Sequence, residues 1–146
     1  MIISRQKGFT LIEIMVVIVI LGILGATSIP VYRTWQMRAR GIEAQAMAKQ
    51  ILDAQIVYFM DNGKFFPDDH TIEIYSEDAA DSENVLAVLN NLNVNIPTGH
   101  FLEYYFHAVN APGNEQFYLT INSTGNFKIF KDGRMVVYTI NKKGEI

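Results

Sequence analysis

The sequence predicts an α+β fold in which a long N-terminal helix packs on an antiparallel β-meander of about four strands. Three observations predict it: an apolar run near the N-terminus, a helical stripe that continues the run, and short aromatic and β-branched segments between turn signals in the last third. The chain has 146 residues, 49% of them hydrophobic. That is enough material for one small folded domain beyond the apolar run.

The apolar run predicts a membrane-spanning helix at residues 9–29. Glu13 is the only charged residue in this range, which is long enough to cross the roughly 30 Å hydrocarbon core of a bilayer. The alternative is a secretory signal cleaved after Ser28. The apolar core of such a signal is usually only about 7 to 15 residues long, and Ala26-Thr27-Ser28 is a poor cleavage site. A spanning helix is therefore favoured.

The residues around Gly8 form the most specific motif of the chain. A basic leader ending in Lys7 precedes Gly8, and Phe9-Thr10-Leu11-Ile12-Glu13 follows it. This segment resembles the processing site of the type IV pilins and of the pseudopilins of type II secretion. Gly22 and Pro30 fall where that family has its helix-loosening glycine and proline. Beyond about the first third of the chain, the resemblance is one of architecture only.

The resemblance implies a division of the chain into three parts. Residues 1–8 are a leader that the prepilin peptidase removes by cutting between Gly8 and Phe9, and the new Phe9 amine is then methylated. Residues 9–29 are a transmembrane helix that becomes the filament core. Residues 30–146 are a globular head that includes the second half of the long helix.

Glu13 has two compatible interpretations. Thr10 and Glu13 have the spacing of a capping box, in which each side chain satisfies a free backbone N–H at the start of a helix. The resemblance implies that the carboxylate also pairs with the N-terminal amine of a neighbouring subunit. Such a pair would set the assembly register, since a misplaced subunit leaves a buried, unpaired charge. It likewise implies that residues 22–30 unwind in the filament, although glycine and proline are also ordinary features of membrane helices.

Past Pro30 the helical pattern persists as an amphipathic stripe. Its members recur near three- and four-residue spacing: Ala44, Met47, Ala48, Ile51, Leu52, Tyr58 and Phe59. Asp61-Asn62-Gly63 supplies a stop signal, so the sequence predicts one helix from Phe9 to about Met60. The stripe is expected to pack on the rest of the head.

The segment 61–83 is predicted to be a solvated acidic loop. It holds eight acidic residues against one basic residue, but it lacks the alternating ligands, central glycine and closing glutamate of an EF-hand loop. We therefore predict no metal site, and calcium binding by the acidic segment is the alternative that stays open at this point. A short helix is expected to follow, capped by Asp81 or Ser82 and continuing through Leu92.

The last third predicts strands at residues 102–109, 117–122, 127–130 and 135–140. Turn signals separate them at Pro112-Gly113-Asn114, at residues 123–126 and at Asp132-Gly133, the strongest hairpin signal of the three. Many type IV pilins close this region with a disulfide. This chain has no cysteine, so its C-terminal edge must be held in another way.

The sequence gives no sign of catalysis or of a cofactor. His70, His100 and His107 are far apart and belong to no paired-histidine metal motif, and no glycine-rich phosphate loop is present. The formal net charge is −3, so a nucleic-acid partner is not expected. These features favour a structural subunit over an enzyme.

The resemblance completes the functional prediction: a subunit of a type IV pilus that serves adhesion, motility or DNA uptake. Its implied partners are other copies in a helical homopolymer, the prepilin peptidase, an inner-membrane platform protein, a cytoplasmic assembly ATPase and, where an outer membrane exists, a secretin. Before assembly the subunit would sit in the cytoplasmic membrane as a single-pass protein with its head outside. Afterwards it would be part of an extracellular pilus.

Two alternatives to a pilin stay open at this point. One is a pseudopilin in a periplasmic pseudopilus of a type II secretion system. The other is a membrane-anchored binding domain that does not polymerise.

Overall fold

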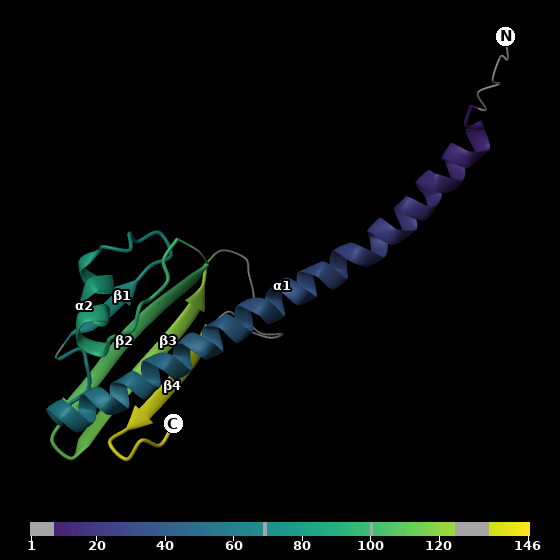
Figure 1. Cartoon of the computed structure of the whole chain (residues 1–146). Helices are drawn as coiled ribbons and strands as arrows, with labels where there is room; N and C mark the ends of the chain where they lie inside the picture. Colours follow the sequence, from purple (N-terminus) through teal and green to yellow (C-terminus); the bar gives the residue numbers. More distant parts are fainter. Residues whose placement is uncertain (1–7, 69, 100, 125–134) are drawn as a thin grey trace, which may run out of the picture. The chain divides into compact units, whose positions relative to one another are not determined.

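The computed structural model describes residues 8–68, 70–99, 101–124 and 135–146. Its elements, in chain order, are α1 (Leu11–Asn62), β1 (Thr71–Ile74), α2 (Glu83–Leu92), β2 (Leu102–Ala111), β3 (Asn114–Ser123) and β4 (Met135–Asn141) (Figure 1). A long helix combined with a four-stranded antiparallel sheet confirms the predicted α+β class. The chain forms two compact units, the first ending at Gln36 and the second spanning Met37–Ile146.

The helix α1 agrees closely with the predicted range. It begins two residues after Phe9 and ends two residues after Met60. By length and composition, it contains a stretch able to cross a membrane. In the second unit, its buried positions repeat at three- and four-residue spacing: Gly41, Ala44, Ala48, Ile51, Leu52 and Gln55. Ala44, Ala48, Ile51 and Leu52 belong to the same hydrophobic core as the buried residues of the sheet. This half of α1 lies over the sheet in Figure 1.

The sheet has the strand order β1-β2-β3-β4, with every neighbouring pair antiparallel. Side chains alternate between its two faces, as the two-residue period of a strand requires. Tyr104, Phe106 and Phe117 are fully buried on the face that packs on α1. The side chains of α2 that join this core are Val85, Val88 and Leu92.

The acidic-loop prediction was wrong over residues 71–74, which form strand β1. Ile72 and Ile74 alternate there with polar residues and are both buried. β1 pairs with β2, Ile72 opposite Phe106 and Glu73 opposite Tyr105. A four-residue strand within an acidic segment gives little signal by itself, and its partner lies about thirty residues away. The predicted strand at 127–130 and the Asp132-Gly133 hairpin fall outside the described residues.

The predicted turn at Pro112-Gly113-Asn114 and the predicted short helix through Leu92 were both confirmed, with one difference at the helix cap. The two residues Pro112 and Gly113 join β2 to β3, and Gly113 has φ of +88°, which favours glycine. Helix α2 starts after Ser82, as predicted. The Ser82 side chain makes no capping hydrogen bond there, so its role differs from the expected cap.

Local polar contacts hold the C-terminal edge without a disulfide. The Asn141 Oδ1 accepts hydrogen bonds from the Lys143 and Glu145 backbone N–H groups, at 2.9 and 3.2 Å. Lys142 Nζ lies 3.3 Å from a carboxylate oxygen of Glu115 and 3.0 Å from the Gly113 carbonyl oxygen. These contacts fasten the end of β4 to the turn between β2 and β3.

Candidate processing and assembly segment

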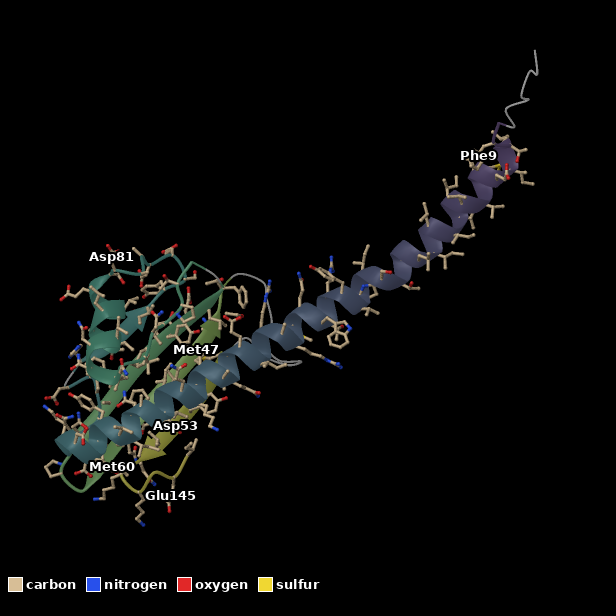
Figure 2. The ribbon with its side chains drawn as sticks, viewed as in Figure 1. Phe9, Met47, Asp53, Met60, Asp81 and Glu145 are labelled. Carbon is tan, nitrogen blue, oxygen red and sulfur yellow. The ribbon has the colours of Figure 1, made fainter. Side chains whose placement is uncertain are left out.

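The candidate segment begins at Gly8 and Phe9, just before the first turn of α1. Phe9 is 83% exposed (Figure 2). A Cβ added to Gly8 would meet nothing within 4 Å, so the fold places no packing demand on this glycine. Gly8 and Phe9 are thus both exposed in the part of the chain that the structure describes.

Thr10 and Glu13 form the reciprocal capping box that their spacing predicts. The Glu13 Oε2 accepts hydrogen bonds from the Thr10 backbone N–H at 2.8 Å and from the Thr10 hydroxyl at 2.9 Å. In return, the Thr10 Oγ1 accepts one from the Glu13 backbone N–H at 3.3 Å. The local role of Glu13 is thus to fix the start of α1, and its carboxylate stays at the exposed end of the helix.

The helix beyond the capping box presents apolar side chains all round. The large apolar residues between Leu11 and Val31 are each about half exposed or more, from 49% at Val17 to 81% at Leu11. A helix that is apolar on every side needs a surrounding of lipid or of other apolar helices. Gly22 and Gly25 have open space where a Cβ would lie, which leaves room for close approach by another helix.

Pro30 lies inside α1 and leaves the Ala26 carbonyl without its usual backbone donor. Three nearby hydroxyls bond back to the helix: Thr27 to the Leu24 carbonyl at 3.0 Å, Ser28 to the same carbonyl at 2.6 Å, and Thr34 to the Pro30 carbonyl at 3.0 Å. Such back-bonding slightly destabilises a helix. Gly22 and Pro30 were predicted from the sequence as helix-loosening residues, whereas these three hydroxyls were not, although their spacing from the carbonyls is visible in it.

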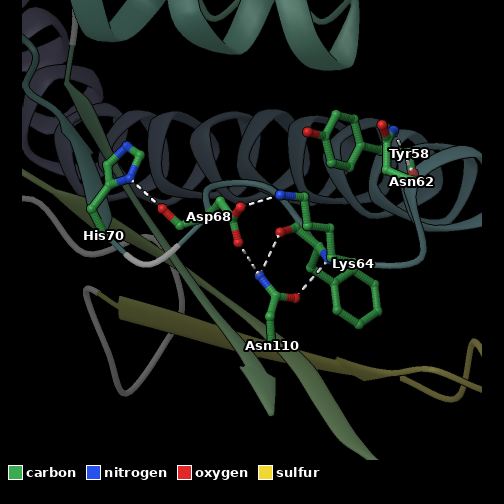
Figure 3. A network of polar contacts seen from close by, with 7 residues as sticks. Tyr58, Asn62, Lys64, Asp68, His70 and Asn110 are labelled. Atoms are coloured by element: carbon green, nitrogen blue, oxygen red, sulfur yellow. Dashed lines mark hydrogen bonds and ion pairs between the residues drawn. The ribbon is translucent and has the colours of Figure 1, made fainter. Parts of the chain in front are cut away.

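A polar network that was not predicted from the sequence lies in the second unit, around the turn after α1 (Figure 3). The Asn110 side chain accepts a hydrogen bond from the Phe65 N–H at 2.8 Å and donates one to the Phe65 carbonyl at 2.9 Å. Lys64 pairs with Asp68, and this contact lowers the pKa of the Asp68 carboxyl below its usual range. Among the described residues, no three His, Asp or Glu side chains are grouped so as to hold a metal ion.

The N-terminal segment has a recognised family pattern. Residues 3–29 match the prokaryotic N-terminal methylation motif. A type IV major pilin protein PilE1 of Neisseria gonorrhoeae is 44% identical over 68 residues, covering 47% of this chain and 41% of the relative. A PilE of the same species is 36% identical over 103 residues, covering 63% of this chain and 61% of the relative. Those two alignments span less than two thirds of each relative.

A fimbrial protein of Moraxella nonliquefaciens extends the similarity to nearly the whole chain. It is 31% identical over 141 residues, which cover 96% of this chain and 89% of the relative. The chain belongs to the type IV pilin family. No solved structure matches it significantly.

Membership of the type IV pilin family accounts for the two dissimilar parts of the molecule. Pilins are structural subunits, so the prediction of a structural protein rather than an enzyme is confirmed. The structure brings Gly8, Phe9, Thr10 and Glu13 together at the start of α1, while Gly22 and Pro30 lie further along the same helix. The roles predicted for these residues in processing and assembly stay predictions.

Proposed function

We propose that this chain is a prepilin, cut between Gly8 and Phe9, methylated at Phe9 and polymerised through residues 9–29 into a surface pilus. The observation that carries the proposal is the match of residues 3–29 to the methylation motif, together with a helix whose large apolar side chains are exposed in the part of the chain that the structure describes. Polymerisation would exchange lipid for neighbouring helices around this surface.

The proposed domain boundaries follow from this account. Residues 1–8 are the leader, residues 9–29 the membrane and filament-core helix, and residues 30–146 the head. Before assembly, the single-pass subunit is held in the cytoplasmic membrane with its head outside. Its partners are other copies, the prepilin peptidase, a platform protein with its cytoplasmic ATPase, and a secretin where an outer membrane exists.

The named relatives support a pilin over a pseudopilin. The relatives from Neisseria are described as type IV major pilins, and the nearly full-length relative as a fimbrial protein. We extend this to a surface filament that serves adhesion, motility or DNA uptake. Loss of surface filaments on deletion, with protein secretion intact, is the result expected of a pilin.

Glu13 is proposed to act twice, first as the cap of α1 and then in pairing with the Phe9 amine of a neighbouring copy. The geometry supports a second role because the carboxylate lies at the exposed end of the helix. Pairing would neutralise two charges inside the apolar filament core. Gly22 and Pro30 are proposed to let the helix loosen there, because both weaken it and the nearby hydroxyls already bond to its carbonyls.

Two substitutions separate the cap from the assembly role. Glu13→Ala removes the carboxylate, whereas Thr10→Ala breaks the capping box and keeps the carboxylate. Filaments would be counted by electron microscopy in cells that express each variant at equal membrane abundance. We expect Glu13→Ala to abolish filaments and Thr10→Ala to retain most of them. Equal filament numbers for Glu13→Ala and the unmodified chain would contradict the assembly role and favour an anchored domain that does not polymerise.

A further inference from the structure

On the outer face of the sheet, two tyrosine hydroxyls each donate a hydrogen bond to a glutamate carboxylate. The Tyr75 hydroxyl donates a hydrogen bond to the Glu73 carboxylate, and the Tyr105 hydroxyl donates one to Glu103 at 3.2 Å. In both cases the acceptor lies two residues earlier on the same strand or its extension. Each hydrogen bond therefore holds its tyrosine ring along the strand, beside a carboxylate.

These four residues form one cluster at the paired strands β1 and β2. Glu73 lies directly opposite Tyr105 in the register. The rings of Tyr75 and Tyr105 meet at 88°, with their centroids 6.1 Å apart. Burial and the nearby Glu103 and Glu73 carboxylates raise the pKa of Tyr105, and the same two carboxylates raise that of Tyr75. We call this cluster of Glu73, Tyr75, Glu103 and Tyr105 the tyrosine–glutamate cluster.

The tyrosine–glutamate cluster is exposed to solvent and negatively charged. Tyr75 is 39% exposed, and the other three side chains are partly exposed. Between residues 65 and 127 the sequence contains nine acidic residues and no lysine or arginine. The hydrogen bond to Glu73 raises the pKa of Tyr75 to about 12. A tyrosine is neutral at pH 7 even at its ordinary pKa. Two neutral rings and two carboxylates are thus available at the surface.

Two aromatic rings at a right angle, beside carboxylates, have the chemistry of a site for an organic cation. The faces of aromatic rings attract cations, and carboxylates add an opposite charge. A lysine ammonium is strongly hydrated and gains little at an exposed site. A quaternary ammonium is weakly hydrated and places methyl groups against ring faces. We propose that the tyrosine–glutamate cluster binds a quaternary ammonium group.

The proposal does not depend on filament assembly, so it can be tested on the unassembled full chain. The protein would be labelled with ¹³C on its tyrosine rings, held in dodecyl maltoside micelles, and titrated with tetramethylammonium chloride or choline chloride. Sodium chloride at the same ionic strength is the reference. We expect saturable shifts of the Tyr75 and Tyr105 ring signals with a dissociation constant on the order of 1–10 mM.

Variants locate the binding. Tyr75→Leu is expected to abolish the saturable shift at Tyr105, and the pair Glu73→Gln with Glu103→Gln to weaken binding at least about fivefold. Tyr118→Leu, on the same face of the sheet but beside His107, is the matched control and should leave binding unchanged. Ring signals that respond alike to sodium and tetramethylammonium, or binding that survives Tyr75→Leu, would overturn the proposal.

A last pair of titrations distinguishes the source of the ammonium group. Choline represents a free metabolite, and glycerophosphocholine represents a lipid headgroup without its chains. The tyrosine–glutamate cluster contains two carboxylates, which repel a phosphate. We therefore expect glycerophosphocholine to bind more weakly than choline. Saturable binding of lysine with no binding of choline would contradict the assignment to a quaternary ammonium.

Discussion

The side-chain amide of Gln55 is hydrogen-bonded to both backbone polar groups of Phe66. The Gln55 Oε1 accepts a bond from the Phe66 N–H at 3.0 Å, and the Gln55 Nε2 donates one to the Phe66 carbonyl. Gln55 has no exposed surface, and it lies on the face of α1 that covers the sheet. A buried amide thus holds the chain where it turns away from α1.

Removing the Gln55 amide should destabilise the second unit. Gln55→Leu leaves two backbone groups of Phe66 buried without partners, at a cost of about 1–3 kcal/mol in the free energy of unfolding. Gln50→Leu changes an exposed position of the same helix and should stay within about 0.5 kcal/mol. Urea unfolding of the full chain in micelles measures both. A Gln55→Leu variant as stable as Gln50→Leu would show that the bonds contribute nothing.

Asn110 should matter less than Gln55, because it is partly exposed. Asn110→Ala removes the two hydrogen bonds to Phe65, and we expect a loss of about 1 kcal/mol. Lys64→Met, which removes the exposed pair with Asp68, should have a smaller effect on stability than Asn110→Ala, because exposed ion pairs contribute little. Because Phe65 and Phe66 are adjacent, the double variant Gln55→Leu with Asn110→Ala should deviate from additivity in the same unfolding experiment.

Tyr104 offers a prediction of the opposite sign. Its side chain is fully buried, and its hydroxyl has no hydrogen-bond partner among the described residues. Burying an unpaired hydroxyl costs free energy, so Tyr104→Phe should raise stability by about 1 kcal/mol. Tyr118→Phe, which breaks a formed bond to Gln116, should not raise stability. A lower unfolding midpoint for Tyr104→Phe than for the unmodified chain would refute the prediction.

The contact of Glu115 with the β2–β3 turn predicts a dependence of stability on pH. Its carboxylate accepts a hydrogen bond from the Gly113 N–H at 2.9 Å and lies beside Lys142, and the pKa of Glu115 is lowered for these reasons. A lowered pKa in the folded state favours folding when the carboxyl is ionised. The contribution is therefore present above the usual glutamate pKa and is lost as the pH falls through the lowered value.

Comparison with Glu115→Gln isolates this effect. The unmodified chain should be the more stable of the two at pH 7, and the difference should shrink when unfolding is measured well below pH 4. A difference that is constant across this range would mean that ionisation of Glu115 plays no part.

The sequence was a good guide wherever a segment signals its own structure. The apolar run and the stripe through Ala48 and Ile51 predicted α1 to within two residues at each end, and Pro112-Gly113 marked a real turn. Thr10 and Glu13 are three residues apart, so their contact was also predictable. Local periodicity and turn chemistry are sufficient for such features.

Features that depend on distant pairing were not predictable. Gln55 reads as an ordinary polar residue of a helix until the turn brings Phe66 against it. β1 exists because β2 pairs with it, and the tyrosine–glutamate cluster requires Glu73 and Tyr105 to be opposite one another in the register. Position 55 continues the spacing of the stripe, and Ile72 and Ile74 alternate with polar residues, but neither pattern identifies the distant partner. The predicted roles of Gly8, Phe9 and Glu13 depend on other proteins, which one chain does not contain.

The central claim is that the chain is processed at Gly8 and assembled into a surface filament. The most direct test is the intact mass and N-terminal fragment spectrum of the protein sheared from the cell surface. The account predicts a chain that begins with N-methylated Phe9 and is abundant in the sheared fraction. A chain that retains Met1, or one that begins near Ile29, would contradict it.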